Sequence, residues 1–128
     1  MKILIISQYF YPENFRINDL AEELYKQKHQ VTVLTGLPNY PKGKIYKGFN
    51  IFSLGYQTRS KYKIFRVPLI PRYSSKSWQL FINYFSFAFF SSIIAPFFLR
   101  EKYDAIFVYE PSPFTVGIPA VIFKKLRK

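Results

Sequence analysis

The chain has 128 residues, 49% of them hydrophobic, which is enough for one domain with a packed core and excludes two large ones. It has no cysteine, so a disulfide framework is excluded and a reducing compartment is expected. The formal net charge is +12, and no acidic residue occurs from Leu24 to Arg100. Such a surface attracts lipid head groups, nucleic acids or phosphorylated substrates, although a solvated basic face of a soluble domain has the same composition.

The first half of the chain alternates strand and helix patterns. Lys2–Ser7 is apolar and β-branched without a polar face, as in a central parallel strand. This short run has no cleavage site after it, so a secretory signal is not indicated and the cytoplasm is expected. A helix is predicted from Phe15 to about Lys28, with Asn14 as its cap. Gln30–Thr35 is a second strand, followed by a loop at 36–50 that is rich in Gly, Pro, Asn and Tyr.

The second half continues the alternation. Lys63–Ile70 is a third strand, and Pro68 inside it predicts a sheet edge. Ser75–Arg100 is a long apolar helix, and Asp104–Tyr109 is a fourth strand. Ser112 and Pro113 are typical of a helix start, so a last helix is expected to run toward Lys128, bent at Pro119.

This alternation predicts an α/β fold, a Rossmann-like doubly wound parallel sheet in the order 3-2-1-4, formed by a single unit over residues 1–128. Strand 4 then lies beside strand 1, and the crevice between their following loops is the expected ligand site. That geometry brings Pro12–Arg16 together with Glu110–Ser112. It also leaves strand 4 as an uncovered edge, so we expect the sheet to be incomplete, as in the N-terminal half of a larger fold.

Four stretches of the chain resemble the N-terminal region of glycosyltransferase family 4, in particular bacterial enzymes that add amino sugars during O-antigen and capsule assembly. The most specific segments are TGLPNYPKGK and YEPSP. The similar stretches cover most of the chain in order: Ser7–Leu24, His29–Phe49, Val67–Phe87 and Tyr103–Ala120. Two departures are Lys28, where relatives commonly have glycine, and the segment 12–16, where many relatives have a Gly-Gly loop.

The resemblance implies a GT-B fold with two Rossmann-like domains and retaining transfer from a nucleotide sugar, such as a UDP-sugar, without a bound metal. The acceptor, often a sugar on a polyprenyl diphosphate, would bind this N-terminal domain. The donor-binding domain is not among the 128 residues, so the chain is expected to be inactive alone and to need a donor-domain chain or C-terminal half. The alternative is a non-catalytic membrane-surface adaptor or an acceptor-presenting subunit of a two-chain transferase.

Two carboxylates are candidates for contact with an acceptor hydroxyl. Glu13 lies at the start of the first helix with Asn14 and Arg16, where free backbone N–H groups and the helix dipole favour an anion. Glu110 directly follows the fourth strand and is a candidate hydroxyl ligand or base. Helix capping by Glu13 and a surface position for Glu110 are the structural alternatives.

The loop after the second strand supplies further candidates. Asn39 and Tyr40 offer hydrogen bonds and sugar-ring stacking, while Lys42 and Lys44 offer phosphate contacts. Ser112 is expected beside them as a substrate contact. The single histidine, His29, is interpreted as structural, because no metal-ligand spacing surrounds it and no metal site is expected.

Residues 80–99 contain no charge and are long enough to span a bilayer. The strands on either side belong to one sheet, so we favour a helix lying partly on the sheet and partly in the interface of an anionic membrane, over a buried or spanning helix. This predicts a peripheral protein on the inner face of the cytoplasmic membrane. The expected membrane contacts are Tyr73, Lys76, Trp78, Phe81, Tyr84 and Phe85.

Two other function classes are not favoured. A nicotinamide oxidoreductase needs a glycine-rich loop after the first strand, and Gln8–Asn14 contains no glycine. Nucleic-acid binding fits the charge, but no recognition module is present, so no nucleic-acid partner is expected.

Overall fold

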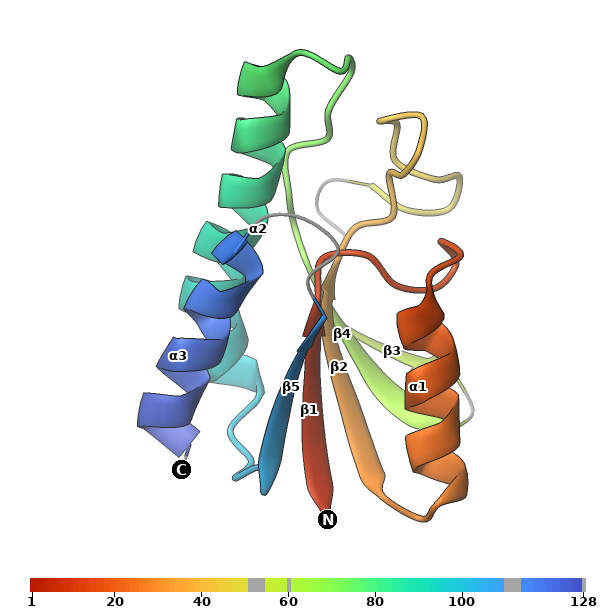
Figure 1. Ribbon diagram of the computed structural model, residues 1–128, viewed down its shortest axis with the longest axis vertical. Coiled ribbons are helices and arrows are strands. Elements are labelled where there is room, and N and C mark those ends of the chain that lie inside the picture. Colours follow the sequence, from red (N-terminus) through yellow and green to blue (C-terminus); the bar gives the residue numbers. More distant parts are fainter. Residues whose placement is uncertain (51–54, 60, 110–113, 128) are drawn as a thin grey trace.

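The structure is a computed structural model that describes residues 1–50, 55–59, 61–109 and 114–127. One mixed sheet stands between a single helix on one face and two helices on the other (Figure 1). Its strands, in spatial order, are β3 (Gly55–Arg59), β4 (Tyr62–Val67), β2 (Gln30–Gly36), β1 (Lys2–Ser7) and β5 (Ala105–Tyr109). The helices are α1 (Arg16–Lys26), α2 (Ser77–Phe98) and α3 (Gly117–Arg127), the last preceded by a 3₁₀ turn at Phe114–Val116.

The parallel part of the sheet confirms the predicted Rossmann-like topology. β1 pairs in parallel with β2 and β5, and β2 pairs in parallel with β4, which is the order 3-2-1-4 of the four predicted strands. In this register Ser7, the last residue of β1, lies opposite Tyr109, the last residue of β5. The loops that follow β1 and β5 therefore leave the sheet side by side, as expected at a switch point.

The prediction that Pro68 lies inside a strand at the sheet edge is wrong. β4 ends at Val67, one residue before Pro68, so the proline removes no hydrogen bond from the sheet. The outer side of β4 is covered by β3, which pairs with it antiparallel, Arg59 opposite Tyr62. β3 is a short run of mixed polarity for which the sequence analysis predicts no element.

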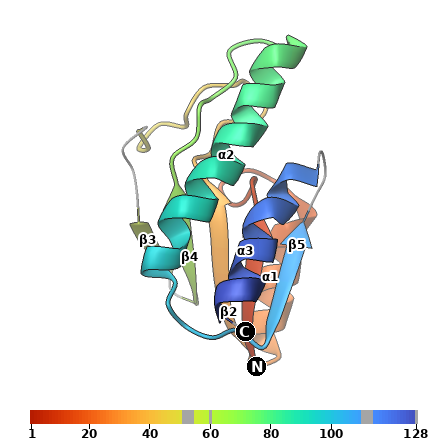
Figure 2. The ribbon, with the colours of Figure 1, turned by 90° about the vertical axis from the view of Figure 1, so that its left-hand side faces the viewer.

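Both faces of the sheet are buried, which explains the continuous apolar strands. Ile3 and Ile5 of β1 point toward α1, where Ile17 and Ala21 pack on them. Leu4 and Ile6 point to the opposite face, in the cluster that α2 and α3 cover. α2 and α3 lie side by side on that face, and α2 extends past the carboxyl ends of the strands (Figure 2).

The prediction that Asn14 caps the first helix is wrong. Helix α1 begins at Arg16, so its N-cap residue is Phe15, which makes no side-chain cap hydrogen bond. At the other end, Lys28 has φ of +67°, its N–H donates to the Tyr25 carbonyl, and the His29 N–H donates to the Leu24 carbonyl. This is a Schellman ending with lysine in the left-handed position that glycine favours.

Lys28→Gly is therefore expected to stabilise the protein by about 1 kcal/mol, because a left-handed conformation strains any residue with a Cβ. Lys28→Ala keeps the Cβ and is the matched control, with no comparable gain. Urea unfolding followed by circular dichroism measures both. Equal stabilisation by the two variants would contradict the conformational explanation.

Candidate functional site

The loops after β1 and β2 are joined by one buried carboxylate. Glu13 is 1% exposed, and its Oε1 accepts the backbone N–H groups of Asn39 at 2.9 Å and Tyr40 at 2.7 Å. Its Oε2 accepts the N–H of Phe10 at 3.2 Å. Three backbone donors from two loops thus converge on one side chain, so Glu13 fixes the shape of this edge of the sheet.

Arg66 of β4 is the buried cation of the same region. Its guanidinium donates to the carbonyl of Gly36 at 2.9 Å and to the carbonyl of Tyr11, and it lies over the ring of Phe49 at 5.1 Å. The side chain is 2% exposed, although its strand neighbours are apolar. Arg66 therefore links β4 to the ends of β1 and β2 from beneath the loops.

The two charges influence each other. Burial raises the pKa of Glu13 above its ordinary value, against the opposing effect of the N–H groups of Tyr40, Asn39 and Phe10 and of Arg66. Burial also lowers the pKa of Arg66 to about 10, while the charge of Glu13 opposes this decrease. Arg66 stays protonated at neutral pH, so the loops enclose a positive charge beneath them.

Above this pair lies an aromatic cluster, formed by Tyr9, Phe15, Tyr40 and Tyr84. Tyr9 stacks on Phe15 with ring centroids 5.1 Å apart, and both rings contact Tyr40, at 5.5 and 5.2 Å. Tyr84 of α2 shares a side-chain hydrogen bond with Tyr9, and burial raises the pKa of Tyr9. Loops after β1 and β2 and the helix α2 all contribute, so the cluster joins three elements at the carboxyl edge.

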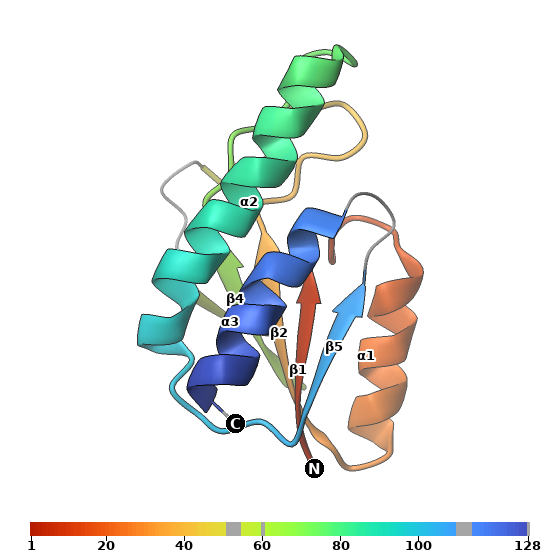
Figure 3. The ribbon, with the colours of Figure 1, turned by 60° about the vertical axis from the view of Figure 1, so that its left-hand side comes forward.

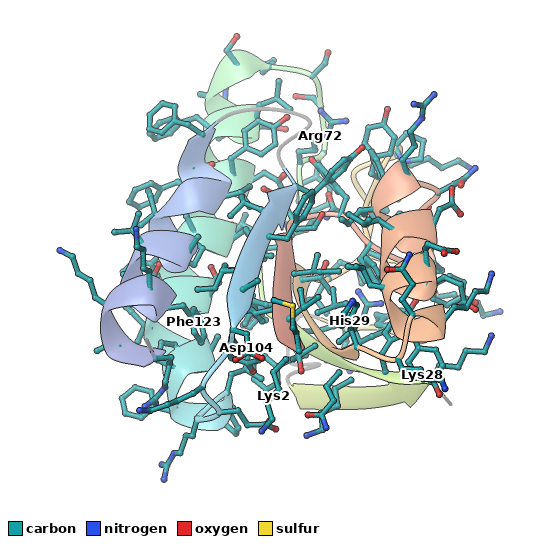
Figure 4. All side chains as sticks on the ribbon, turned by 60° about the horizontal axis from the view of Figure 1, so that its bottom comes forward. Lys2, Lys28, His29, Arg72, Asp104 and Phe123 are labelled. Atoms are coloured by element: carbon teal, nitrogen blue, oxygen red, sulfur yellow. The ribbon has the colours of Figure 1, made fainter. Side chains whose placement is uncertain are left out.

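Arg72 lies over the exposed side of this cluster. Its guanidinium carbon is 5.5 Å from the centre of the Tyr40 ring, a cation–π contact, and the side chain is half-buried. Arg72 stands at the carboxyl edge, far from Lys2 and Asp104 at the amino ends of β1 and β5 (Figure 4). Tyr40, 39% exposed, and Arg72 therefore present a ring and a cation together to solvent.

The loop that holds Tyr40 is tightly packed. Gly43 has φ of +68°, and a Cβ at this position would lie 1.5 Å from the carbonyl oxygen of Arg72, so only glycine fits. The Gly43 N–H donates to the carbonyl of Asn39 at 2.7 Å, and the Tyr46 hydroxyl donates to the carbonyl of Tyr40 at 2.6 Å. These contacts hold the backbone of the loop on both sides of Tyr40.

Two buried amide oxygens in these loops have no hydrogen-bond partner. They are Oε1 of Gln8 and Oδ1 of Asn39, each on a residue at most 1% exposed. Their amide nitrogens donate hydrogen bonds: Nε2 of Gln8 to Oδ1 of Asn83 at 2.8 Å, and Nδ2 of Asn39 to the carbonyl of Leu37 at 2.9 Å. Each oxygen can accept one more bond from a hydroxyl or a water.

The predicted substrate contacts separate into two groups. Glu13, Asn39 and Tyr40 are brought together by hydrogen bonds, whereas Asn14, Arg16, Lys42 and Lys44 are exposed on the same loops and the start of α1. The oxygens of Glu13 are occupied by backbone donors, so the structure gives it a positioning role rather than that of a base. Glu110 and Ser112 lie outside the described residues.

Three residues of the site were not predicted from sequence. Tyr9 and Arg72 lie in loops that directly follow β1 and β4, at the edge where ligands bind in this topology, and position alone was the available signal. Arg66 lies inside an apolar strand, where a lone arginine is itself unusual.

The predicted membrane contacts are exposed except for Tyr84. Tyr73 is 74% exposed, Trp78 60%, Phe81 64% and Phe85 50%, and Lys76 is exposed as well. Tyr84 is half-buried and bonded to Tyr9, so it belongs to the aromatic cluster.

The opposite edge of the sheet carries structural ion pairs. The Glu101 carboxylate forms ion pairs with Nζ of Lys63 at 2.8 Å and with Nζ of Lys2 at 3.2 Å. The backbone N–H of Lys2 donates a hydrogen bond to the Asp104 carboxylate at 2.7 Å. His29 lies there too, with Nδ1 3.5 Å from the terminal amine. In the described part of the chain, no group of three or more His, Asp or Glu side chains is arranged to hold a metal ion.

Comparisons of this chain with protein-family models, curated proteins and solved structures found no match.

Replacing Glu13 tests its positioning role. Glu13→Ala removes the acceptor of three backbone N–H groups, each costing roughly 1 kcal/mol or more when left unpaired, so a loss of about 3 kcal/mol in unfolding free energy is expected. Glu23→Ala, at an exposed position on α1, is the control and should change stability little. A loss below about 1 kcal/mol would show that the loops hold together without this carboxylate.

The pH dependence of Glu13 has a definite sign. Because its pKa is raised in the folded state, the folded protein holds the proton more tightly than the unfolded chain. The stability of the wild type, minus that of Glu13→Gln, should therefore fall as pH rises from the ordinary value of 4.5 through the raised pKa. Urea titrations at several pH values measure this difference, and a rise with pH would contradict the assigned direction.

Proposed function

We propose that this chain is the acceptor-binding part of a retaining glycosyltransferase, which moves a sugar from a nucleotide-sugar donor to a lipid-linked glycan in cell-surface polysaccharide synthesis. The observation that carries the proposal is the exposed Tyr40 ring with Arg72 over it, at the carboxyl edge of a Rossmann-like sheet. Aromatic rings stack on the apolar faces of sugars, and arginine pairs with phosphate oxygens. A sugar attached to a diphosphate offers both groups.

The surroundings of this pair support the same ligand class. Arg16, Lys42 and Lys44 add exposed positive charge on the adjacent loops, which attracts a diphosphate.

In the proposed reaction, the acceptor hydroxyl oxygen bonds to the anomeric carbon of the donor sugar while the bond from that carbon to the nucleoside diphosphate breaks. The hydroxyl proton passes to the departing phosphate oxygen. Glu13 is not the base in this scheme, because it is buried and its two oxygens hold the backbone N–H groups of the loops. Its role is to hold Tyr40 where the acceptor sugar stacks.

The donor half of the site would come from a second Rossmann-like unit. β5 has β1 as its neighbour on one side only and forms an edge of the described sheet, with Phe107 42% exposed on it. This apolar edge supports a second unit, or a partner chain, completing the structure.

Binding of a soluble acceptor tests the site directly. We expect N-acetylglucosaminyl diphosphate carrying a short water-soluble alcohol to bind in calorimetry, and Tyr40→Ala to weaken binding roughly tenfold through lost stacking. Tyr25→Ala is the matched control, because Tyr25 is 38% exposed on α1 and lies outside the site. An equal effect of both variants would contradict the assignment of Tyr40.

Transfer assays separate the enzyme from an adaptor. With a radiolabelled nucleotide sugar and lipid-linked acceptor, the chain alone should give no product, and product should form when a donor-domain chain is added. Turnover by the chain alone would contradict the division into two halves. Absence of product with every donor domain, together with glycan binding, would favour an acceptor-presenting subunit.

A further inference from the structure

Helix α2 is apolar on its exposed side as well as on its buried side. The buried side carries Asn83, Ser86 and Ser91 together with Phe87, Ala88 and Ala95, while other large apolar side chains point to solvent. The exposed ones recur every four residues, so they form a stripe that winds around the helix by about 40° per step and spreads over nearly half of its circumference: Phe81 (64%), Phe85 (50%), Phe89 (50%), Ile93 (49%) and Phe97 (67%). One side of α2 is thus a continuous apolar stripe.

The buried polar groups of α2 have structural partners. Asn83 donates to the carbonyl of Ile70 at 2.7 Å, and the Ser86 hydroxyl donates to the carbonyl of Asn83 at 2.8 Å. The Ser91 hydroxyl donates to the carbonyl of Phe87 at 2.6 Å. These contacts explain why polar residues face the sheet, but nothing within the described structure covers the apolar stripe.

Helix α3 continues the apolar surface. Ile118 (40%) and Val121 (54%) are exposed on α3, and Phe114 (79%) is exposed on the 3₁₀ turn before it. α2 and α3 lie side by side in two views (Figure 2, Figure 3). We call the α2 stripe and these three residues the two-helix face.

Charge around the two-helix face is mainly positive, and Glu101, the acidic residue next to Arg100, is paired with Lys2 and Lys63. Neither α2 nor α3 contains an acidic residue. Basic residues stand at both ends of the helix pair, with Arg72 and Lys76 before α2, and Arg100, Lys124 and Lys125 at the other end. A second copy of this +12 chain would bring the same charge to the face, whereas an anionic lipid surface complements it.

We infer that the two-helix face inserts into the interfacial layer of an anionic bilayer, with α2 and α3 both lying in the membrane surface. The described chain has one helix, α2, that is long and apolar enough to cross a membrane. It lies flat in this arrangement, because β4 before it and β5 after it belong to the same sheet. Membrane insertion itself does not depend on the proposed function. Its functional consequence does: because α2 also carries Tyr84, insertion would set the aromatic cluster beside the lipid that bears the acceptor.

Trp78 is the single tryptophan of the chain and an exposed residue of α2, so fluorescence quenching by brominated acyl chains reports insertion. Single-tryptophan variants are made by adding Phe89→Trp, Val121→Trp or Tyr25→Trp to Trp78→Phe. With vesicles of phosphatidylglycerol and phosphatidylcholine that contain no glycan, we expect quenching at positions 78, 89 and 121. Position 25, on α1 across the sheet, is the matched control and should remain unquenched.

Quantitative changes are expected as well. Phe89→Ser should reduce vesicle partitioning roughly tenfold, and Lys124→Ala should reduce it roughly fivefold in a salt-sensitive manner. Pure phosphatidylcholine vesicles should bind more weakly than anionic ones.

Three results would overturn the inference. Quenching at position 78 alone would mean that only the tip of α2 touches lipid, and quenching at 25 would mean that the protein unfolds on the bilayer. No quenching, with dimers in sedimentation, would assign the face to a second copy. Because these vesicles carry no sugar, each result leaves glycan binding to be judged by calorimetry alone.

Discussion

The carboxylate of Glu13 is the constraint on which the candidate site depends. It accepts backbone N–H groups from the loops after β1 and β2, and Arg66 lies beneath the same loops, bonded to the carbonyls of Gly36 and Tyr11. A buried charge is costly unless hydrogen bonds and a countercharge compensate it. Here three N–H donors and Arg66 oppose the effect of burial, which still raises the pKa of Glu13. The placement of the Tyr40 backbone follows from this arrangement.

Helix α2 connects the two proposed activities. Its inner side contributes Asn83 to Gln8 and Tyr84 to Tyr9, so it supports the loops of the candidate site. Its outer side is the apolar stripe. A helix that contacts loops on one side and lipid on the other would hold the candidate site at a fixed height above the membrane, where a lipid-linked sugar is presented.

The sequence predicted the fold because both faces of the parallel strands are buried and read as continuous apolar runs. It missed β3, since an edge strand of mixed polarity has no such signal, and it misread Pro68, which lies just beyond β4. In the candidate site, Glu13, Asn39 and Tyr40 were predicted as candidates because they lie in the loops that follow the first two strands. Arg66 and Arg72 were not, because their contacts join segments far apart in the chain, and the role of Glu13 depends on three backbone donors that no pattern specifies.

The central claim is that a phosphorylated sugar binds at the carboxyl edge of the sheet, on Tyr40 and Arg72. Nuclear magnetic resonance of the labelled chain, titrated with a soluble sugar diphosphate, tests it most directly. The account predicts chemical-shift changes at the N–H groups of Asn39 and Tyr40 and at the Arg72 guanidinium. Changes centred on Lys2, His29 and Asp104 at the opposite edge would contradict it.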